Sequence, residues 1–169
     1  MIVGNADEMR EVGRRLSASL LEIPAGPIVI TLQGELGAGK TTLVRGVLQA
    51  FGVVGAVRSP TYTLIEPYEL MGRRIYHLDL YRLGNARDLD GLGLRDLLEP
   101  DAILLIEWPE RAGEGALPRP DLEVKIAYAA DARVEGEKQA EVRRLRLLPL
   151  TCSGVLLANS VQSSGPTDK

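Results

Sequence analysis

The sequence predicts an α/β fold in which helices alternate with buried strands, with antiparallel strands added at the edges of the sheet. Residues 28–32 and 102–106 are short apolar runs without polar alternation, as in strands that are covered on both faces. The segment from residue 5 to residue 23 instead carries apolar side chains at helical spacing. Residues 122–128 and 141–148 alternate between apolar and polar, which is typical of hairpin strands.

The length of 169 residues is enough for one domain with a sizeable core and too short for two. Hydrophobic residues make up 45% of the chain and charged residues 25%, which excludes a wholly disordered or coiled-coil protein. We expect the domain to occupy residues 1–150. From Ser153 onward the chain is rich in small and polar residues, so we expect residues 151–169 to form a partly disordered tail.

The composition also excludes several kinds of site. Cys152 is the single cysteine and has no partner for an internal disulfide, and Cys152 with His77 is too small a set for a zinc site.

The apolar runs are far shorter than the ~20 residues that span a bilayer, and no apolar signal core follows Met1, so we expect a cytoplasmic protein. The net charge of −3 argues against strong direct binding to nucleic acid, because basic residues supply most of the non-specific affinity.

The predicted elements follow from local signals. Asn5, with Glu8 three residues later, is a capping-box-like helix start. The weakest element is a helix at residues 87–98, because Gly91 and Gly93 each cost about 1 kcal/mol relative to Ala. In chain order we expect a helix from Asn5 to before Pro24, a strand at 28–32, a glycine-rich turn at 34–39, a helix at 41–51, a hairpin of strands 61–66 and 74–80, a helix at 87–98, a strand at 102–106 and a hairpin of strands 122–128 and 141–148.

The glycine-rich turn carries the chemistry. Residues 34–41 read Gly-Glu-Leu-Gly-Ala-Gly-Lys-Thr and fit the phosphate-loop pattern G-x-x-x-x-G-K-[ST], between a strand and a helix. The glycines let backbone N–H groups converge on an anion, and the helix N-terminus adds partial positive charge. Lys40 supplies a full charge to the outer phosphates, and the Thr41 hydroxyl can ligate Mg²⁺. We expect a nucleoside triphosphate site, and ATP in preference to GTP because the guanine-specific N-K-x-D pattern is absent.

Two carboxylates are candidates to complete such a site. Glu107 follows the apolar run 102–106, and Asp79 follows residues 75–78 in the same way, so both are predicted at the carboxyl ends of strands, where open α/β sheets bind ligands. Either could also be an ordinary strand-end acid. Glu in place of the usual Asp leaves open whether Glu107 would reach Mg²⁺ directly or through water.

Two further residues beside these acids each have more than one possible role. His77 lies on the same strand face as Asp79, and a lone histidine of this kind is more often structural than catalytic. Trp108 either packs at the edge of the sheet or, if exposed, contributes to a partner surface.

Four blocks, in this order and spacing, resemble the small bacterial ATPases of the TsaE (YjeE) family, which serve tRNA threonylcarbamoyladenosine biosynthesis. The blocks are G-E-L-G-A-G-K-T-T at 34–42, S-P-T-Y-T-L-I-E-P-Y at 59–68, Y-H-L-D-L-Y-R-L at 76–83 and L-I-E-W-P-E at 105–110. The phosphate loop alone is shared by a very large superfamily, so the second and third blocks carry the family resemblance. It covers roughly residues 5–128.

The resemblance implies a P-loop NTPase-like three-layer α/β fold with a mainly parallel sheet and antiparallel edge hairpins. It implies ATP or ADP and Mg²⁺ as ligands, and ATPase activity that is weak for the chain alone. It also implies a complex with the threonylcarbamoyl transferase subunit TsaD and its paralogue TsaB, through which the chain would meet tRNA only indirectly. That complex modifies the adenosine beside the anticodon in tRNAs that read codons beginning with A.

The resemblance also implies roles for individual residues. Asp79 corresponds to the catalytic acid, assisted by Lys40, while Thr41 and Glu107 would organise Mg²⁺. Thr61 lies in a switch-like segment, residues 59–64, near the γ-phosphate. The expected nucleotide contacts are Gly37, Ala38, Gly39, Lys40, Thr41, Thr42 and Thr61, with Asn5, Ala6, Ala132 and Arg133 flanking the base.

The residues are also compatible with two other functions. A P-loop small-molecule kinase would transfer the phosphate to a metabolite, but its arginine-bearing lid is not apparent, since Arg111, Arg119 and Arg133 are scattered. A non-enzymatic nucleotide switch would use the same loop only to control a partner.

Overall fold

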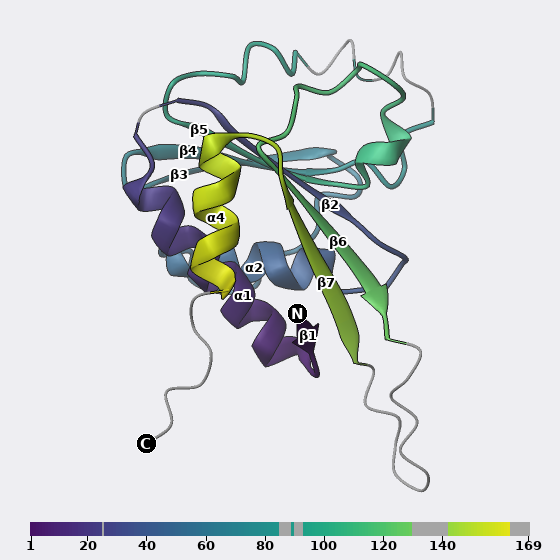
Figure 1. Ribbon diagram of the computed structural model, residues 1–169. Helices are drawn as coiled ribbons and strands as arrows, with labels where there is room; N and C mark the ends of the chain where they lie inside the picture. Colours follow the sequence, from purple (N-terminus) through teal and green to yellow (C-terminus); the bar gives the residue numbers. More distant parts are fainter. Residues whose placement is uncertain (25, 85–88, 90–92, 130–141, 163–169) are drawn as a thin grey trace, which may run out of the picture.

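The fold is known from a computed structural model, which describes residues 1–24, 26–84, 89, 93–129 and 142–162. Three helices lie on one side of a seven-stranded sheet in the described part of the chain (Figure 1). The elements are β1 Ile2–Val3, α1 Ala6–Glu22, β2 Ile28–Gln33, α2 Lys40–Ala50, β3 Ile65–Leu70, β4 Arg73–Asp79, β5 Ala102–Glu107, the 3-10 turn η1 Pro109–Arg111, β6 Leu122–Tyr128, β7 Arg143–Pro149 and α4 Cys152–Gln162.

The sheet has the order β1-β7-β6-β2-β5-β4-β3. Its centre, β6-β2-β5-β4, is parallel, and β3, β7 and β1 pair antiparallel at the two edges. The predicted α/β class, with a mainly parallel sheet and antiparallel edge hairpins, is therefore confirmed. The central position of β2 and β5 explains why their sequences are apolar throughout, since both faces are covered.

The core has one part on each face of the sheet. On the first face, α1, α2 and α4 pack against side chains such as Ile30, Ile103 and Val124. On the second face, Val29, Leu104 and Ile106 are covered by residues of the connecting segments, which include Leu83, Leu94 and Leu117. Connecting segments thus form the third layer in the described part of the chain.

The expected start of α1 is confirmed. The Asn5 side chain caps the helix by accepting a hydrogen bond from the Glu8 N–H at 2.9 Å, and the Glu8 carboxylate accepts from the Gly4 N–H at 2.7 Å. This arrangement satisfies backbone donors at the first turn, so the motif has a structural explanation of its own.

Two predicted elements are wrong in part. The first hairpin strand begins at Ile65 rather than at Thr61, because Leu64 has φ +63° and the hydroxyl groups that precede it bond to Asp79 instead of to a neighbouring strand. Residues 93–97 form turns and not the end of a helix, with Gly93 at φ +59°. Most of the remainder of the predicted helix 87–98 lies outside the described residues.

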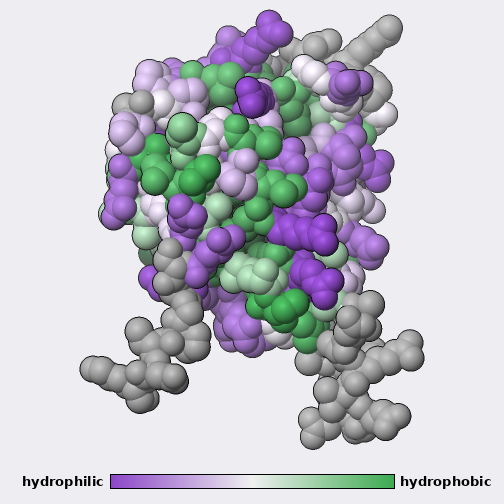
Figure 2. All heavy atoms as spheres, in the orientation of Figure 1, coloured by the Kyte–Doolittle hydropathy of each residue, from purple (hydrophilic) through white to green (hydrophobic). Residues whose placement is uncertain are grey.

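The expected tail from residue 151 is wrong for its first part. Cys152–Gln162 form α4, which buries Leu157, Ala158 and Val161 and packs against α1, β6 and β7. The small residues in this segment allow a close approach, because a Cβ on Gly154 would lie 1.9 Å from the Asp121 carbonyl oxygen. Figure 2 shows hydrophobic patches among hydrophilic residues on the face that carries α4 and β7.

No helix in the described ranges is long and apolar enough to cross a bilayer.

Candidate nucleotide site

The candidate site lies where three parallel strands end. In the register of the sheet, Leu32 of β2 is paired with Glu107 of β5, and Glu107 is paired with Asp79 of β4. The glycine-rich loop that follows β2 therefore begins at the same edge as both carboxylates, as the sequence predicted. This edge is where open α/β sheets bind ligands.

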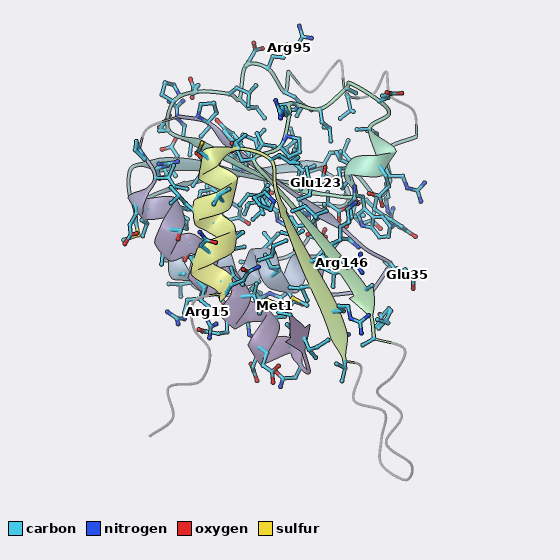
Figure 3. The ribbon with its side chains drawn as sticks, viewed as in Figure 1. Met1, Arg15, Glu35, Arg95, Glu123 and Arg146 are labelled. Carbon is cyan, nitrogen blue, oxygen red and sulfur yellow. The ribbon has the colours of Figure 1, made fainter. Side chains whose placement is uncertain are left out.

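The loop between β2 and α2 needs glycine for two reasons. A Cβ on Gly34 would lie 2.4 Å from the Ile126 carbonyl oxygen, so a larger residue would separate the loop from β6. Gly39 caps α2 with φ +108°, which is a left-handed conformation that glycine adopts at low cost. Figure 3 shows Glu35 on this loop at the outer edge of the molecule. The loop thus presents the N-terminus of α2, with its partial positive charge, to the site.

Lys40 is 4% exposed and is held inside the loop. Its Nζ donates to the carbonyl oxygens of Gly34 at 2.7 Å and Glu35 at 3.0 Å. Burial lowers the pKa of Lys40 from its ordinary value, while the negative charges of Glu107, Glu110 and Asp79 oppose that shift. The ammonium group therefore lies in a partly desolvated position where an anionic ligand would interact strongly with it.

Glu107 joins the loop to the sheet. The Thr41 hydroxyl donates to Oε2 of Glu107 at 3.0 Å, and Nε2 of His77 lies 2.8 Å from Oε1 of the same carboxylate. Glu107 and His77 are both buried, with 2% and 0% exposure. The two residues expected to organise Mg²⁺ are thus in direct contact, and His77 is the third member of the group.

Asp79 has a different set of partners. Its Oδ2 accepts hydrogen bonds from the hydroxyls of Ser59 and Thr61, the latter at 3.0 Å, and its Oδ1 accepts from the Tyr81 N–H at 3.0 Å. Asp79 therefore holds the segment 59–61 next to the loop. Thr61, expected at the start of a strand, lies in a turn.

Trp108 lies over the loop lysine. The Nζ of Lys40 is 3.6 Å from the centre of the Trp108 ring, and the Tyr81 ring is 4.9 Å away on a tilted plane. Trp108 has φ +60°, an uncommon conformation for a large residue that is often found at functional sites. The contact combines a cation–π attraction with half-burial of the indole, so Trp108 belongs to the site.

These groups surround a cavity of about 320 Å³, within the size range of small-ligand pockets. Among the predicted residues, the lining includes Gly37, Gly39, Lys40, Thr41, Thr42, Thr61, Asp79 and Glu107. The described residues contain no cluster of three His, Cys, Asp or Glu side chains that could hold a metal. A hydroxyl next to one carboxylate fits Mg²⁺, which keeps several waters and takes its other ligands from phosphates.

Three of the predicted nucleotide contacts, Ala38, Asn5 and Ala6, do not line the cavity. Ala38 is a buried residue of the loop, and Asn5 and Ala6 lie at the start of α1, where the Asn5 side chain caps the helix. Ala132 and Arg133 lie outside the described residues. A role of Asn5, Ala6, Ala132 and Arg133 near the base stays a prediction.

The cavity also contains residues to which the sequence analysis assigned no role. Tyr81 and Arg82 line it, and the Arg82 guanidinium lies 4.1 Å from the centre of the Tyr62 ring. Both belong to the block at 76–83. Their positions two and three residues after Asp79 could have indicated that they lie at the site. At the outer side of the loop, the Tyr128 hydroxyl donates to the Leu36 carbonyl oxygen at 3.4 Å.

Comparison with known proteins finds relatives of this chain. The family model described as threonylcarbamoyl adenosine biosynthesis protein TsaE matches residues 3–138. A protein of Haemophilus influenzae named tRNA threonylcarbamoyladenosine biosynthesis protein TsaE is 48% identical over 126 residues, covering 74% of this chain and 79% of that protein. A Streptomyces coelicolor protein of the same name is 40% identical over 145 residues, covering 84% of this chain and 90% of its own length.

A crystal structure of Bacillus subtilis YdiB has a similar fold. The TM-score is 0.73 at 24% identity, and the match covers 96% of this chain and 93% of that chain. At this level of identity the likeness supports the fold alone.

Proposed function

Because the chain belongs to the family of threonylcarbamoyl adenosine biosynthesis proteins TsaE, we propose that it acts in threonylcarbamoyladenosine formation in tRNA as an ATP-binding and ATP-hydrolysing subunit. One observation carries this proposal. The glycine loop and the side chains of Lys40, Thr41, Glu107 and Asp79 line the same cavity. Phosphoryl chemistry needs mainly positioning and charge stabilisation, and these groups can supply both.

Each group has a proposed task. The loop amides and Lys40 bind the β- and γ-phosphates, and Lys40 reaches them by leaving its carbonyl partners in the loop. Thr41 and Glu107 would hold Mg²⁺, and the bound ion would neutralise phosphate charge. Asp79 holds or orients the segment 59–61 and is the carboxylate that acts in the hydrolytic step, through either the attacking water or that segment.

We further propose that the chain works with the transferase subunit TsaD and its paralogue TsaB, and meets tRNA only through them. Exposed apolar side chains beside the cavity support a protein partner, since Leu36 is 70% exposed and Tyr62 is 83% exposed. The negative net charge gives little support to direct tRNA binding. Contact at the segment 59–64 would couple partner binding to hydrolysis.

The experiment is an ATPase assay and calorimetry with ATP, for the chain alone and with both partner subunits. We expect low hydrolysis alone and a clear rise with the partners. Lys40→Ala removes a full charge beside the phosphates, worth up to about 3 kcal/mol in charge-assisted hydrogen bonds, so ATP affinity should fall by about 100-fold. Hydrolysis should be lost in both settings.

The matched control is Lys125→Ala, since Lys125 is an exposed lysine on β6 and should leave affinity and activity unchanged. Unchanged ATP affinity in Lys40→Ala would refute the assignment of the site. Equal turnover with and without the partners would refute activation by them. Transfer of labelled phosphate from ATP to a metabolite would instead favour a kinase.

A further inference from the structure

His77 occupies a position where the sheet otherwise carries apolar residues. It lies on β4 two residues after Ile75 and pairs in register with Leu105 of β5, both of which belong to the core beneath the helices. The imidazole is fully buried, and its Nδ1 has no hydrogen-bond partner among the described residues. A buried nitrogen without a partner costs free energy, so packing alone does not explain a histidine at this position.

Within the described part of the chain, the ring makes one polar contact, which is with Glu107. Nε2 lies 2.8 Å from Oε1, and the second oxygen of the carboxylate, Oε2, accepts the hydrogen bond of Thr41 at 3.0 Å. The two oxygens of Glu107 thus have different partners, His77 on the neighbouring strand β4 and Thr41 in the first turn of α2. A carboxylate accepts hydrogen bonds, so the geometry requires the proton on Nε2 of His77.

We propose that His77 is a positioning residue, which binds Oε1 of Glu107 and thereby leaves Oε2 beside the Thr41 hydroxyl, where these two residues would hold Mg²⁺. The inference rests on the proposed function, because it concerns the metal of the ATP site. Side chains behind a ligand set its orientation, and their loss typically reduces metal affinity by about 10- to 100-fold. Without His77, the Glu107 side chain would be free to rotate, and the hydroxyl of Thr41 would lose its fixed neighbour.

The first test uses the native protein, because His77 is the single histidine of the chain and gives an unambiguous signal. Long-range ¹H–¹⁵N NMR of the imidazole reports which nitrogen carries the proton, without any nucleotide. We expect the proton on Nε2, and a shift of that signal in Glu107→Gln. A neutral ring protonated at Nδ1 would overturn the proposal.

The second test compares His77→Gln with His77→Asn. The amide nitrogen of Gln can take the place of Nε2, whereas the shorter Asn cannot reach Glu107. Calorimetry with ATP at increasing Mg²⁺ gives the half-saturating Mg²⁺ concentration. We expect it to rise about 10- to 100-fold in His77→Asn and to stay within about 3-fold of the native value in His77→Gln, with ATP affinity in EDTA unchanged in both.

The outcomes separate the two proposals. Equal Mg²⁺ dependence in both variants would overturn the role of His77, as would a loss of ATP affinity in EDTA that matches the loss in Mg²⁺. Absence of ATP binding by the native chain would refute the proposed function, and the NMR measurement would still decide the position of the proton. Thermal unfolding of each variant without nucleotide provides the control for folding.

Discussion

The two acids of the site differ in the groups they bind, although they are neighbours in register. Glu107 bonds to the loop hydroxyl of Thr41, whereas Asp79 bonds to the hydroxyls of the segment 59–61. Buried acids with separate partners commonly have separate tasks. Within the proposed function, we therefore expect Glu107 to act with the metal and Asp79 in the hydrolytic step.

A pair of isosteric amide variants tests this division at the residue scale. Glu107→Gln should raise the Mg²⁺ concentration needed for ATP binding and reduce hydrolysis, because an amide is a weaker ligand than a carboxylate. Asp79→Asn should keep ATP and Mg²⁺ affinity near normal, while hydrolysis falls by about 10²- to 10⁴-fold, as for a lost acid or base. Calorimetry against Mg²⁺, followed by single-turnover hydrolysis, measures both effects.

The reverse pattern would show that the two roles are exchanged. If Asp79→Asn lost metal-dependent binding while Glu107→Gln kept it, Asp79 would be the residue that organises the metal. Thermal unfolding of both variants shows whether either loss comes from an altered fold.

At the scale of elements, the position of α2 depends on its contact with α1. A Cβ on Gly46 of α2 would lie 2.2 Å from the Arg10 carbonyl oxygen, and a Cβ on Gly13 of α1 would lie 2.2 Å from that of Leu43. Each helix thus approaches the backbone of the other at a glycine. Because α2 begins at Lys40, this contact also determines where the loop lysine and the helix N-terminus lie.

Gly46→Ala tests the close approach. Alanine is favoured over glycine within a helix by about 1 kcal/mol, so the substitution would stabilise a helix at a position with room for the methyl group. Here the new methyl group meets backbone, and overpacking of this kind costs about 1–3 kcal/mol. We expect a net loss of unfolding free energy in urea denaturation, together with weaker ATP binding because α2 is displaced.

Gly26→Ala is the matched control, since nothing lies within 4 Å of the Cβ it would add, and its stability should change by less than about 0.5 kcal/mol. A Gly46→Ala protein as stable as the native chain would show that the helices can move apart without cost.

At the scale of the whole molecule, the sequence predicted the features that depend on the pattern of neighbouring residues. The uninterrupted apolar runs of β2 and β5 predicted buried strands, which the structure places at the centre of the sheet, and the loop and Glu107 at their carboxyl ends predicted the candidate site. Local patterns did not predict contacts between distant segments. Thr61 has a residue type suited to a strand, but its hydroxyl bonds to Asp79, and the ring of His77 has its partner 30 residues away.

The segment from residue 151 shows the same limit. Its small and polar residues suggested a tail, because composition does not reveal that α1, β6 and β7 leave a surface that a short helix can cover. Thr151 begins this helix by accepting a hydrogen bond from the Gly154 N–H at 3.1 Å and donating to Oδ1 of Asp121 at 2.6 Å. The helix therefore belongs to the folded domain.

Two adjacent leucines test whether α4 stabilises the whole domain. Leu157 is fully buried, whereas Leu156 is 54% exposed, so the same substitution has different consequences at the two positions. Leu157→Ala should lower the free energy of unfolding by about 2–5 kcal/mol, since it removes buried methyl groups and leaves a cavity. Leu156→Ala should change it by less than about 0.5 kcal/mol.

Thermal unfolding measures this difference, and at about 2–4 °C per kcal/mol the midpoint for Leu157→Ala should fall by at least about 4 °C. Well below that midpoint, ATP affinity should be unchanged in both variants, because no residue of α4 lines the cavity. Equal midpoints for the two variants would mean that α4 contributes nothing to the domain. A loss of ATP affinity in Leu157→Ala at a temperature where the protein is folded would instead mean that α4 acts on the site through α1, which packs against both α4 and α2.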